Sequence, residues 1–157
     1  MLQREVTLKR RRPTAEQIAR AETILAIKDE AERKKLPHLA EEYARRALWL
    51  AKLSETVTVP VQALRIGDLA VCAMPFEAFA EIGLDIKKRS PFPRTMVIDI
   101  ANAPNGYLPT PEQHKLGGYE TWLGTCRVQE DASVILVNNL LEMLNDLHKV
   151  TASQRAD

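Results

Sequence analysis

The chain has 157 residues, enough for one domain with its own core, and its 45% hydrophobic and 27% charged residues are typical of a globular protein. The net charge of +1 creates no global field that would favour nucleic acid, an anionic membrane or an acidic substrate. No apolar run reaches the ~20 residues that span a bilayer, there is no secretory signal pattern, and two cysteines make no disulfide framework, so we expect a cytoplasmic protein.

The N-terminal third predicts a helical hairpin that follows a basic arm. Residues 1–13 contain the run "LKRRRP", which we expect to be solvated rather than bound to phosphates. The stretch Thr14–Gln17 fits a capping box and predicts a helix over residues 18–35. Pro37 ends this helix because proline removes a backbone donor, and the apolar spacing predicts a second helix over residues 38–53.

After residue 55 the pattern changes to that of β-strands. Residues 56–66 are β-branched and alternate, and Gly67-Asp68 turns the chain into the apolar residues 69–74, which together predict a hairpin. Pro60 indicates an edge strand or a bulge in the first strand. The second strand is apolar throughout and is expected to be covered on both faces.

The remaining sequence predicts a helix over residues 77–90, a further buried strand over residues 94–101 and a long amphipathic helix over residues 130–150, before a frayed tail at 150–157. The inward face of the C-terminal helix is expected to carry Val134, Val137, Leu141, Leu144 and either Leu147 or His148. The predicted fold is α/β: a single domain over residues 1–157, with a helical hairpin, then a mixed sheet with covering helices and a C-terminal amphipathic helix.

A candidate crevice lies where two of the predicted strands end. Glu77 follows one strand, and the loop "NAPNGYLPTPEQHKLGGYET" at residues 102–121 follows the next. If the two strands are parallel and joined by a right-handed crossover, both exits lie at one edge, where ligands collect in open α/β sheets. The crevice would then hold one carboxylate and the two phenols of Tyr107 and Tyr119. The plainer interpretation of Glu77 alone is a favourable charge on a helix dipole.

Other conventional signals of chemistry are absent from the sequence. There is no Gly-rich phosphate loop, no HExxH motif and no nucleophile elbow. His114 lies in the loop and is a candidate ligand contact, although a polar turn residue is the plainer interpretation. Cys72 lies in an apolar run and is interpreted as a buried, inert thiol.

Several short motifs in fixed order carry a family resemblance over roughly residues 57–147. A strand leads to Pro-x-Glu at residues 75–77, a helix and a strand ending in Asn102 follow, and then come Tyr-x-x-Thr at 107–110 and Tyr-Glu at 119–120. This arrangement resembles the C-terminal part of the catalytic domain of neutral/alkaline (non-lysosomal) ceramidases. It is most similar to the bacterial branch without the immunoglobulin-like domain.

The resemblance implies a role for each of three residues. Glu77 and Tyr107 fall on zinc ligands, and Tyr119 falls on the catalytic tyrosine beside the scissile amide. Zinc lowers the pKa of an oxygen acid that it binds, so a phenolate ligand is chemically reasonable. The implied activity is hydrolysis of N-acylsphingosine or a related N-acyl substrate, with Zn²⁺ shared with residues outside this chain.

Two departures from the family pattern matter. Phe76 replaces the glycine of the family's Pro-Gly-Glu turn. The family's two histidine ligands and its active-site serine come from an N-terminal half that has no counterpart here. Because three protein ligands are the norm for a catalytic zinc, this chain alone is expected to be an inactive half-site with little affinity for zinc.

Three interpretations remain open at this point. The chain is part of a zinc amide hydrolase that a companion N-terminal half completes, or a non-catalytic module of the same fold that forms a homo-oligomer or binds a partner. The third is a nucleic-acid contact through the basic arm, which ranks last, so no nucleic-acid partner and no transmembrane segment are expected. An exposed apolar sheet face or edge is expected in the first two cases.

Overall fold

The computed structural model describes the backbone of residues 1–154 and the side chains of residues 1–149. The strands are β1 (Leu2–Lys9), β2 (Thr56–Ile66), β3 (Leu69–Ala73), β4 (Glu77–Ala78), β5 (Arg94–Ile98) and β6 (Tyr107–Leu108). The helices are α1 (Ala15–Ala26), α2 (Glu30–Arg33), α3 (Ala40–Lys52), α4 (Ala80–Arg89), α5 (Pro111–Leu116), the short 3-10 turn η1 (Tyr119–Thr121) and α6 (Ala132–Gln154).

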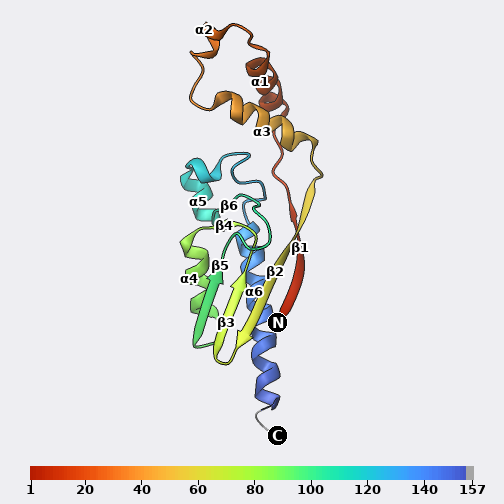
Figure 1. Cartoon of the computed structure of the whole chain (residues 1–157), viewed down its shortest axis with the longest axis vertical. Helices are drawn as coiled ribbons and strands as arrows, with labels where there is room; N and C mark the ends of the chain where they lie inside the picture. Colours follow the sequence, from red (N-terminus) through yellow and green to blue (C-terminus); the bar gives the residue numbers. More distant parts are fainter. Residues whose placement is uncertain (155–157) are drawn as a thin grey trace.

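A four-stranded mixed sheet organises the chain, in the order β1-β2-β3-β5. β2 and β3 form the antiparallel hairpin predicted from the alternating pattern and the turn at Gly67, and α4 connects β3 to the parallel strand β5. The carboxyl ends of β3 and β5 therefore lie at one edge, which faces the α1–α3 hairpin (Figure 1). The α/β class with a mixed sheet and a leading helical hairpin is confirmed.

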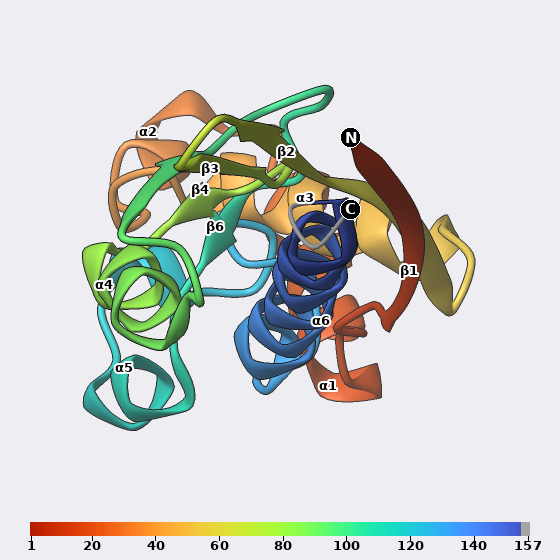
Figure 2. The ribbon, with the colours of Figure 1, turned by 90° about the horizontal axis from the view of Figure 1, so that it is seen from below.

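Helices α4 and α6 pack on the same face of the sheet (Figure 2). Val59, Val61 and Ala63 alternate along β2 toward this face and are almost fully buried, as period-2 geometry requires. From α6, Val137, Leu141 and Leu144 enter the same core as predicted, whereas Val134 is 47% exposed, so its predicted inward position was wrong. None of the described helices is both long and apolar enough to cross a bilayer.

The opposite face of the sheet carries no helix in the part of the chain that is described (Figure 2). β3 is buried as predicted, but β5 is an edge strand, and the prediction of a buried strand there was wrong. Met96 and Ile98 project from β5 away from the core and are 53% and 42% exposed, and Ile100 after the strand is 50% exposed. An apolar run predicts a strand, but it does not show whether another layer covers it.

The N-terminal segment differs most from its prediction. Residues 2–9 form β1, which pairs antiparallel with β2 along its whole length, and Leu8 is fully buried. Beyond the strand, Arg11 and Arg12 donate hydrogen bonds to the backbone carbonyls of residues 121 and 51. Residues 2–9 therefore belong to the sheet, and Arg11 and Arg12 are bonded to the backbone of other segments, so the prediction of a solvated basic arm was wrong.

The helices also differ in their ends. The capping box between Thr14 and Gln17 is present, but the predicted helix over residues 18–35 is two helices, because α1 ends at Ala26 and Asp29 caps the short α2. α6 continues to Gln154, longer than predicted. The remaining residues of the predicted frayed tail, 155–157, lie outside the described residues.

Candidate active site

Glu77 belongs to a two-stranded sheet, not to a helix. β4 (Glu77–Ala78) pairs parallel with β6 (Tyr107–Leu108), and the Glu77 amide donates to the carbonyl of Gly106 at 3.0 Å. α4 begins only at Ala80, so the prediction of a helix from residue 77 was wrong by three residues. The interpretation of Glu77 as a charge in the first turn of a helix is therefore excluded.

The residue before Glu77 explains why the turn tolerates a large side chain. Phe76 is fully buried in the main core, and its carbonyl accepts a hydrogen bond from Ile100 at 2.8 Å. It is not among the residues with positive φ, so the backbone freedom of glycine is not needed here. The side chain of Phe76 therefore adds a core contact at the exit from β3.

The register of β4 and β6 places Glu77 directly opposite Tyr107. The two side chains are hydrogen-bonded, and this bond, followed by burial and by the charge of the carboxylate, raises the pKa of Tyr107. A carboxylate can only accept, so the phenol O–H donates the hydrogen bond to Glu77. A hydrogen bond thus joins the two residues that the sequence singled out, at the carboxyl edge of the sheet.

A glycine positions Tyr107 against the next segment of the loop. Gly106 has a φ of +89°, and a Cβ at this residue would lie 2.4 Å from the carbonyl oxygen of Thr125. The same carbonyl accepts a hydrogen bond from the Tyr107 amide at 3.1 Å. Only glycine allows this close approach, so Gly106 lets the backbone of Tyr107 lie against that of Thr125.

Tyr119 joins the same site from η1. Its ring packs edge-to-face on Tyr107, with ring centroids 5.9 Å apart, and it is 44% exposed. Trp122 packs on Tyr119 at 5.9 Å, and Tyr43 of α3 packs on Trp122 at 5.3 Å. All three tyrosines of the chain therefore belong to one aromatic cluster (Tyr43, Tyr107, Tyr119 and Trp122). Sequence reasoning missed Tyr43 and Trp122, whose only signal was the scarcity of aromatic residues.

Arg46 of α3 reaches the Tyr119 hydroxyl. Its Nε donates to Glu42 at 2.9 Å, its guanidinium lies 5.3 Å from the ring centroid of Tyr43, and it is hydrogen-bonded to Tyr119. A guanidinium has only donors, so the Tyr119 oxygen must accept this bond. The phenolic O–H of Tyr119 then remains available to donate to a different acceptor, such as the oxygen of a carbonyl group.

His114 has a structural role. Its Nε2 lies 3.8 Å from the thiol of Cys126, and burial, followed by the charge of Arg11, lowers the pKa of His114. Burial likewise raises the pKa of Cys126 and raises that of Cys72 to about 12. The thiols are therefore protonated and inert, as expected for Cys72, and the histidine is an uncharged packing partner.

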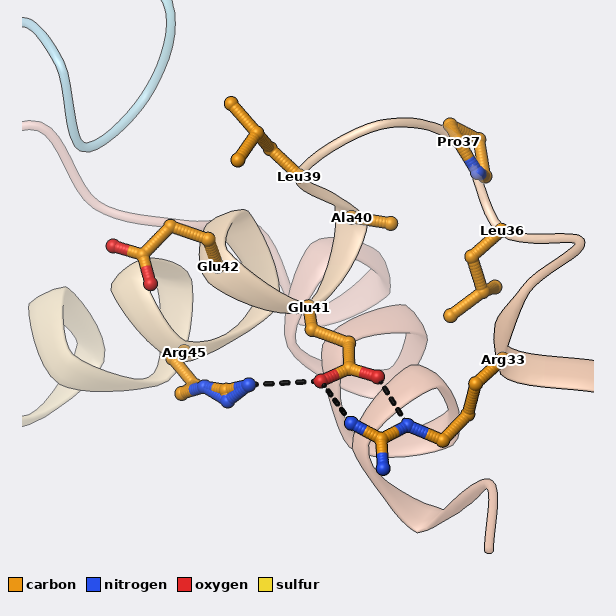
Figure 3. A pocket seen from close by; sticks show the side chains of 8 residues that line it. All are labelled: Arg33, Leu36, Pro37, Leu39, Ala40, Glu41, Glu42 and Arg45. Atoms are coloured by element: carbon orange, nitrogen blue, oxygen red, sulfur yellow. Dashed lines mark hydrogen bonds and ion pairs between the residues drawn. The ribbon is translucent and has the colours of Figure 1, made fainter. Parts of the chain in front are cut away.

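Two hollows lie on the helical hairpin. One, of about 530 Å³, lies between α1, α3 and the 122–123 turn, and it is bordered by Ala44, Ala47, Tyr43 and Trp122. The other, of about 300 Å³, lies at the turn before α3, where Glu41 accepts hydrogen bonds from Arg33 and Arg45 at 2.7 and 2.8 Å (Figure 3). The charges in the second hollow are already paired, so the first is the better candidate for a ligand.

A zinc ion finds only part of a ligand set in this chain. Glu77 and Tyr107 supply oxygen ligands from paired positions, and these are suitable for zinc once the phenol of Tyr107 has lost its proton. No group of three or more His, Cys, Asp or Glu side chains among the described residues could hold a metal ion. The described residues therefore fit one side of a zinc site but do not complete it.

Comparisons with known proteins give one clear likeness, which is of fold. No protein-family model matches the sequence, and no curated protein matches it. Among solved structures, a ceramidase complexed with C2 matches with a TM-score of 0.54 at 21% identity, covering 59% of this chain and 15% of that chain. The neutral ceramidase from Pseudomonas aeruginosa matches with the same TM-score and identity, covering 59% of this chain and 16% of its own. The chain spans about one sixth of these proteins, and the matched part has the fold of a segment of a neutral ceramidase.

Proposed function

We propose that this chain is the C-terminal part of a neutral ceramidase-like, zinc-dependent amide hydrolase. One observation carries the proposal. Glu77, Tyr107 and Tyr119, the three residues that the family resemblance singled out, meet at one sheet edge although they come from three separate segments. In this function Glu77 and Tyr107 are zinc ligands, and the remaining ligands come from a companion N-terminal half.

The chemistry assigns separate tasks to these side chains. Hydrolysis breaks the C–N bond of an amide, and the water hydroxyl goes to the acyl carbon while a proton goes to the amine. A bound zinc supplies Lewis-acid chemistry with an open coordination position. Tyr119 uses its free O–H to stabilise the negative charge that develops on the amide oxygen, and Arg46 holds it in the donor role. Tyr107 must lose its phenolic proton, with which it donates a hydrogen bond to Glu77, before it can act as a ligand.

The apolar hollow supports an N-acyl lipid or a related amide as substrate. It is lined mainly by apolar side chains of α1 and α3, and Trp122, which borders it, packs directly on Tyr119. An acyl chain in this hollow would leave its amide near the phenols. N-acylsphingosine and other N-acyl substrates share this requirement.

The bare sheet face supports the need for a companion half. Met96, Ile98 and Ile100 form an exposed apolar row, and β5 leaves one edge of the sheet unpaired. A second polypeptide layer on this face would bury the row and bring the missing ligands to the edge that holds Glu77. The alternative function is a non-catalytic module that oligomerises through the same face, which the incomplete ligand set favours.

The test is reconstitution with the companion half. Release of a fluorescent acyl chain from an N-acylsphingosine is measured for the chain alone, for the companion alone and for the two together with zinc. We expect hydrolysis only in the mixture, with a loss of about 10²- to 10³-fold for Tyr119→Phe, the usual effect of removing one oxyanion donor. A complex that binds tightly but has no zinc and no hydrolysis would support the non-catalytic alternative.

A further inference from the structure

Three arginines from distant parts of the sequence surround the loop that carries Tyr119. Arg10 forms a backbone bridge to Val128, next to Arg127. Arg127 donates from Nε to the carbonyl of Gly124 at 3.3 Å, and its guanidinium lies 5.3 Å from the ring of Trp49 in α3. Arg46 packs closely against Gly124: a Cβ added at Gly124 would lie 3.0 Å from the Cβ of Arg46. We call Arg10, Arg46 and Arg127 the arginine cluster.

The charge of this cluster is largely uncompensated. Arg46 is paired with Glu42 at 2.9 Å, whereas neither Arg10 nor Arg127 forms an ion pair with any described residue. Burial, followed by the charges of Arg46 and Arg10, lowers the pKa of Arg127. Mutual repulsion between half-buried cations costs free energy, which a bound anion would recover.

Unsatisfied donors lie in the same region. Among the described residues, four buried polar side-chain atoms lack a hydrogen-bond partner, and three of them are Arg10 Nε, Tyr43 Oη and Thr125 Oγ1. Thr125 is only 5% exposed and lies between Gly124 and the buried Cys126. Arg10 Nε can only donate, and the hydroxyls of Tyr43 and Thr125 can donate or accept, so an anionic acceptor is a partner that suits all three groups. Buried polar groups are usually paired, and a concentration of exceptions calls for an explanation.

We propose that the arginine cluster is a binding subsite for an anionic group, a carboxylate or a phosphate. Guanidinium forks match both groups geometrically and bind them with charge-assisted hydrogen bonds. Because Arg46 also bonds to Tyr119, the anion lies beside the phenol that is proposed to face the amide. In so far as it rests on the proposed function, this subsite favours, among the related N-acyl substrates, an amide that carries an anionic group near its amide bond, a group that N-acylsphingosine lacks.

Thermal unfolding of the purified chain tests the subsite without zinc, companion or amide. The melting temperature is measured in chloride, in millimolar inorganic phosphate and in millimolar acetate, all at one ionic strength. A ligand at ten times its dissociation constant should raise the melting temperature by about 3–6 °C. Arg127→Gln and Arg10→Gln should abolish the rise, whereas the control Arg65→Gln, which removes an arginine that bonds to Gly67 at the other end of β2, should keep it.

The melting temperature of the same variants in chloride alone gives a second test, of the repulsion within the arginine cluster. Because removal of Arg127 relieves repulsion, Arg127→Gln in chloride should unfold no more than about 1 °C below the wild type. If Arg127→Gln fails to fold because it also loses its contact with Trp49, Arg10→Gln decides the question. A response to phosphate alone or to acetate alone identifies the anion. No response in the wild type, or an equal response in the wild type and Arg10→Gln, overturns the subsite and leaves the zinc proposal untouched.

Discussion

The substitution Gly106→Ala tests how the chain holds Tyr107 in place. A Cβ at Gly106 would lie 2.4 Å from the carbonyl oxygen of Thr125, a backbone atom that has no flexible side chain to move aside. The φ of +89° costs an L-residue roughly 1–2 kcal/mol, and separating the two segments also weakens the Tyr107 to Thr125 hydrogen bond by about 1 kcal/mol. We expect a total destabilisation of about 2–4 kcal/mol, allowing for repacking.

A matched control separates the close contact from the cost of the dihedral angle. Gly67 has a φ of +61°, and a Cβ there would meet nothing within 4 Å. Gly67→Ala should therefore cost only the strain, roughly 1–2 kcal/mol. Urea unfolding followed by circular dichroism gives both free energies. Equal losses for the two variants would refute the argument that close approach to Thr125 positions Tyr107.

The remaining predictions concern the proton, the metal and the exposed face. Folding raises the pKa of Tyr107, so its contribution to stability is complete below the unfolded pKa of ~10 and is lost as pH rises through the folded pKa. The unfolding free energy should therefore fall more steeply above pH 10 in the wild type than in Tyr107→Phe. Zinc binding by the chain alone should be weak and should strengthen with pH below that pKa, since the phenol of Tyr107 must lose its proton to act as a ligand. Equilibrium dialysis with metal analysis measures this, and a stoichiometric zinc that survives dialysis in a monomer contradicts the half-site. Met96→Glu should reduce self-association or companion binding in sedimentation experiments. The control Leu116→Glu, at a residue on α5 that is 79% exposed, should leave both unchanged. A compact wild-type monomer that binds no apolar dye would contradict a role of the exposed sheet face in association.

Local pattern predicted the elements whose neighbours are close in sequence. The β2–β3 hairpin follows from alternation and one turn, and the start of α1 follows from the Thr14 capping box, because both depend on contacts within a few residues. β1 was missed because its buried residues, Val6 and Leu8, alternate with polar and charged ones, and its partner β2 begins almost fifty residues later. The exposure of β5 was missed because burial depends on what packs above a strand, which the apolar run itself does not encode.

The candidate site shows the same division. A parallel crossover predicts that Glu77 and Tyr107 approach each other, and the structure pairs them residue for residue. The strand pairing of Glu77 was missed because β4 and β6 have two residues each, too short for any periodic signal. Arg46 and Tyr43 could not be assigned to the site, because only tertiary packing brings α3 against the Trp122 turn.

The small separate core of the helical hairpin has a consequence for motion. Its buried residues are three alanines, Ala21, Ala44 and Ala47, so little apolar area holds α1 against α3. Cooperative units with few buried contacts open at lower free energy than the main core, and their amides exchange with solvent sooner. The hairpin should therefore exchange as an early unit, while β2 and β3 exchange last. Each opening would take Tyr43 and Arg46 away from Trp122 and Tyr119. The hydrogen bond that Arg46 donates to the Tyr119 oxygen would therefore form and break as the α1–α3 hairpin opens and closes.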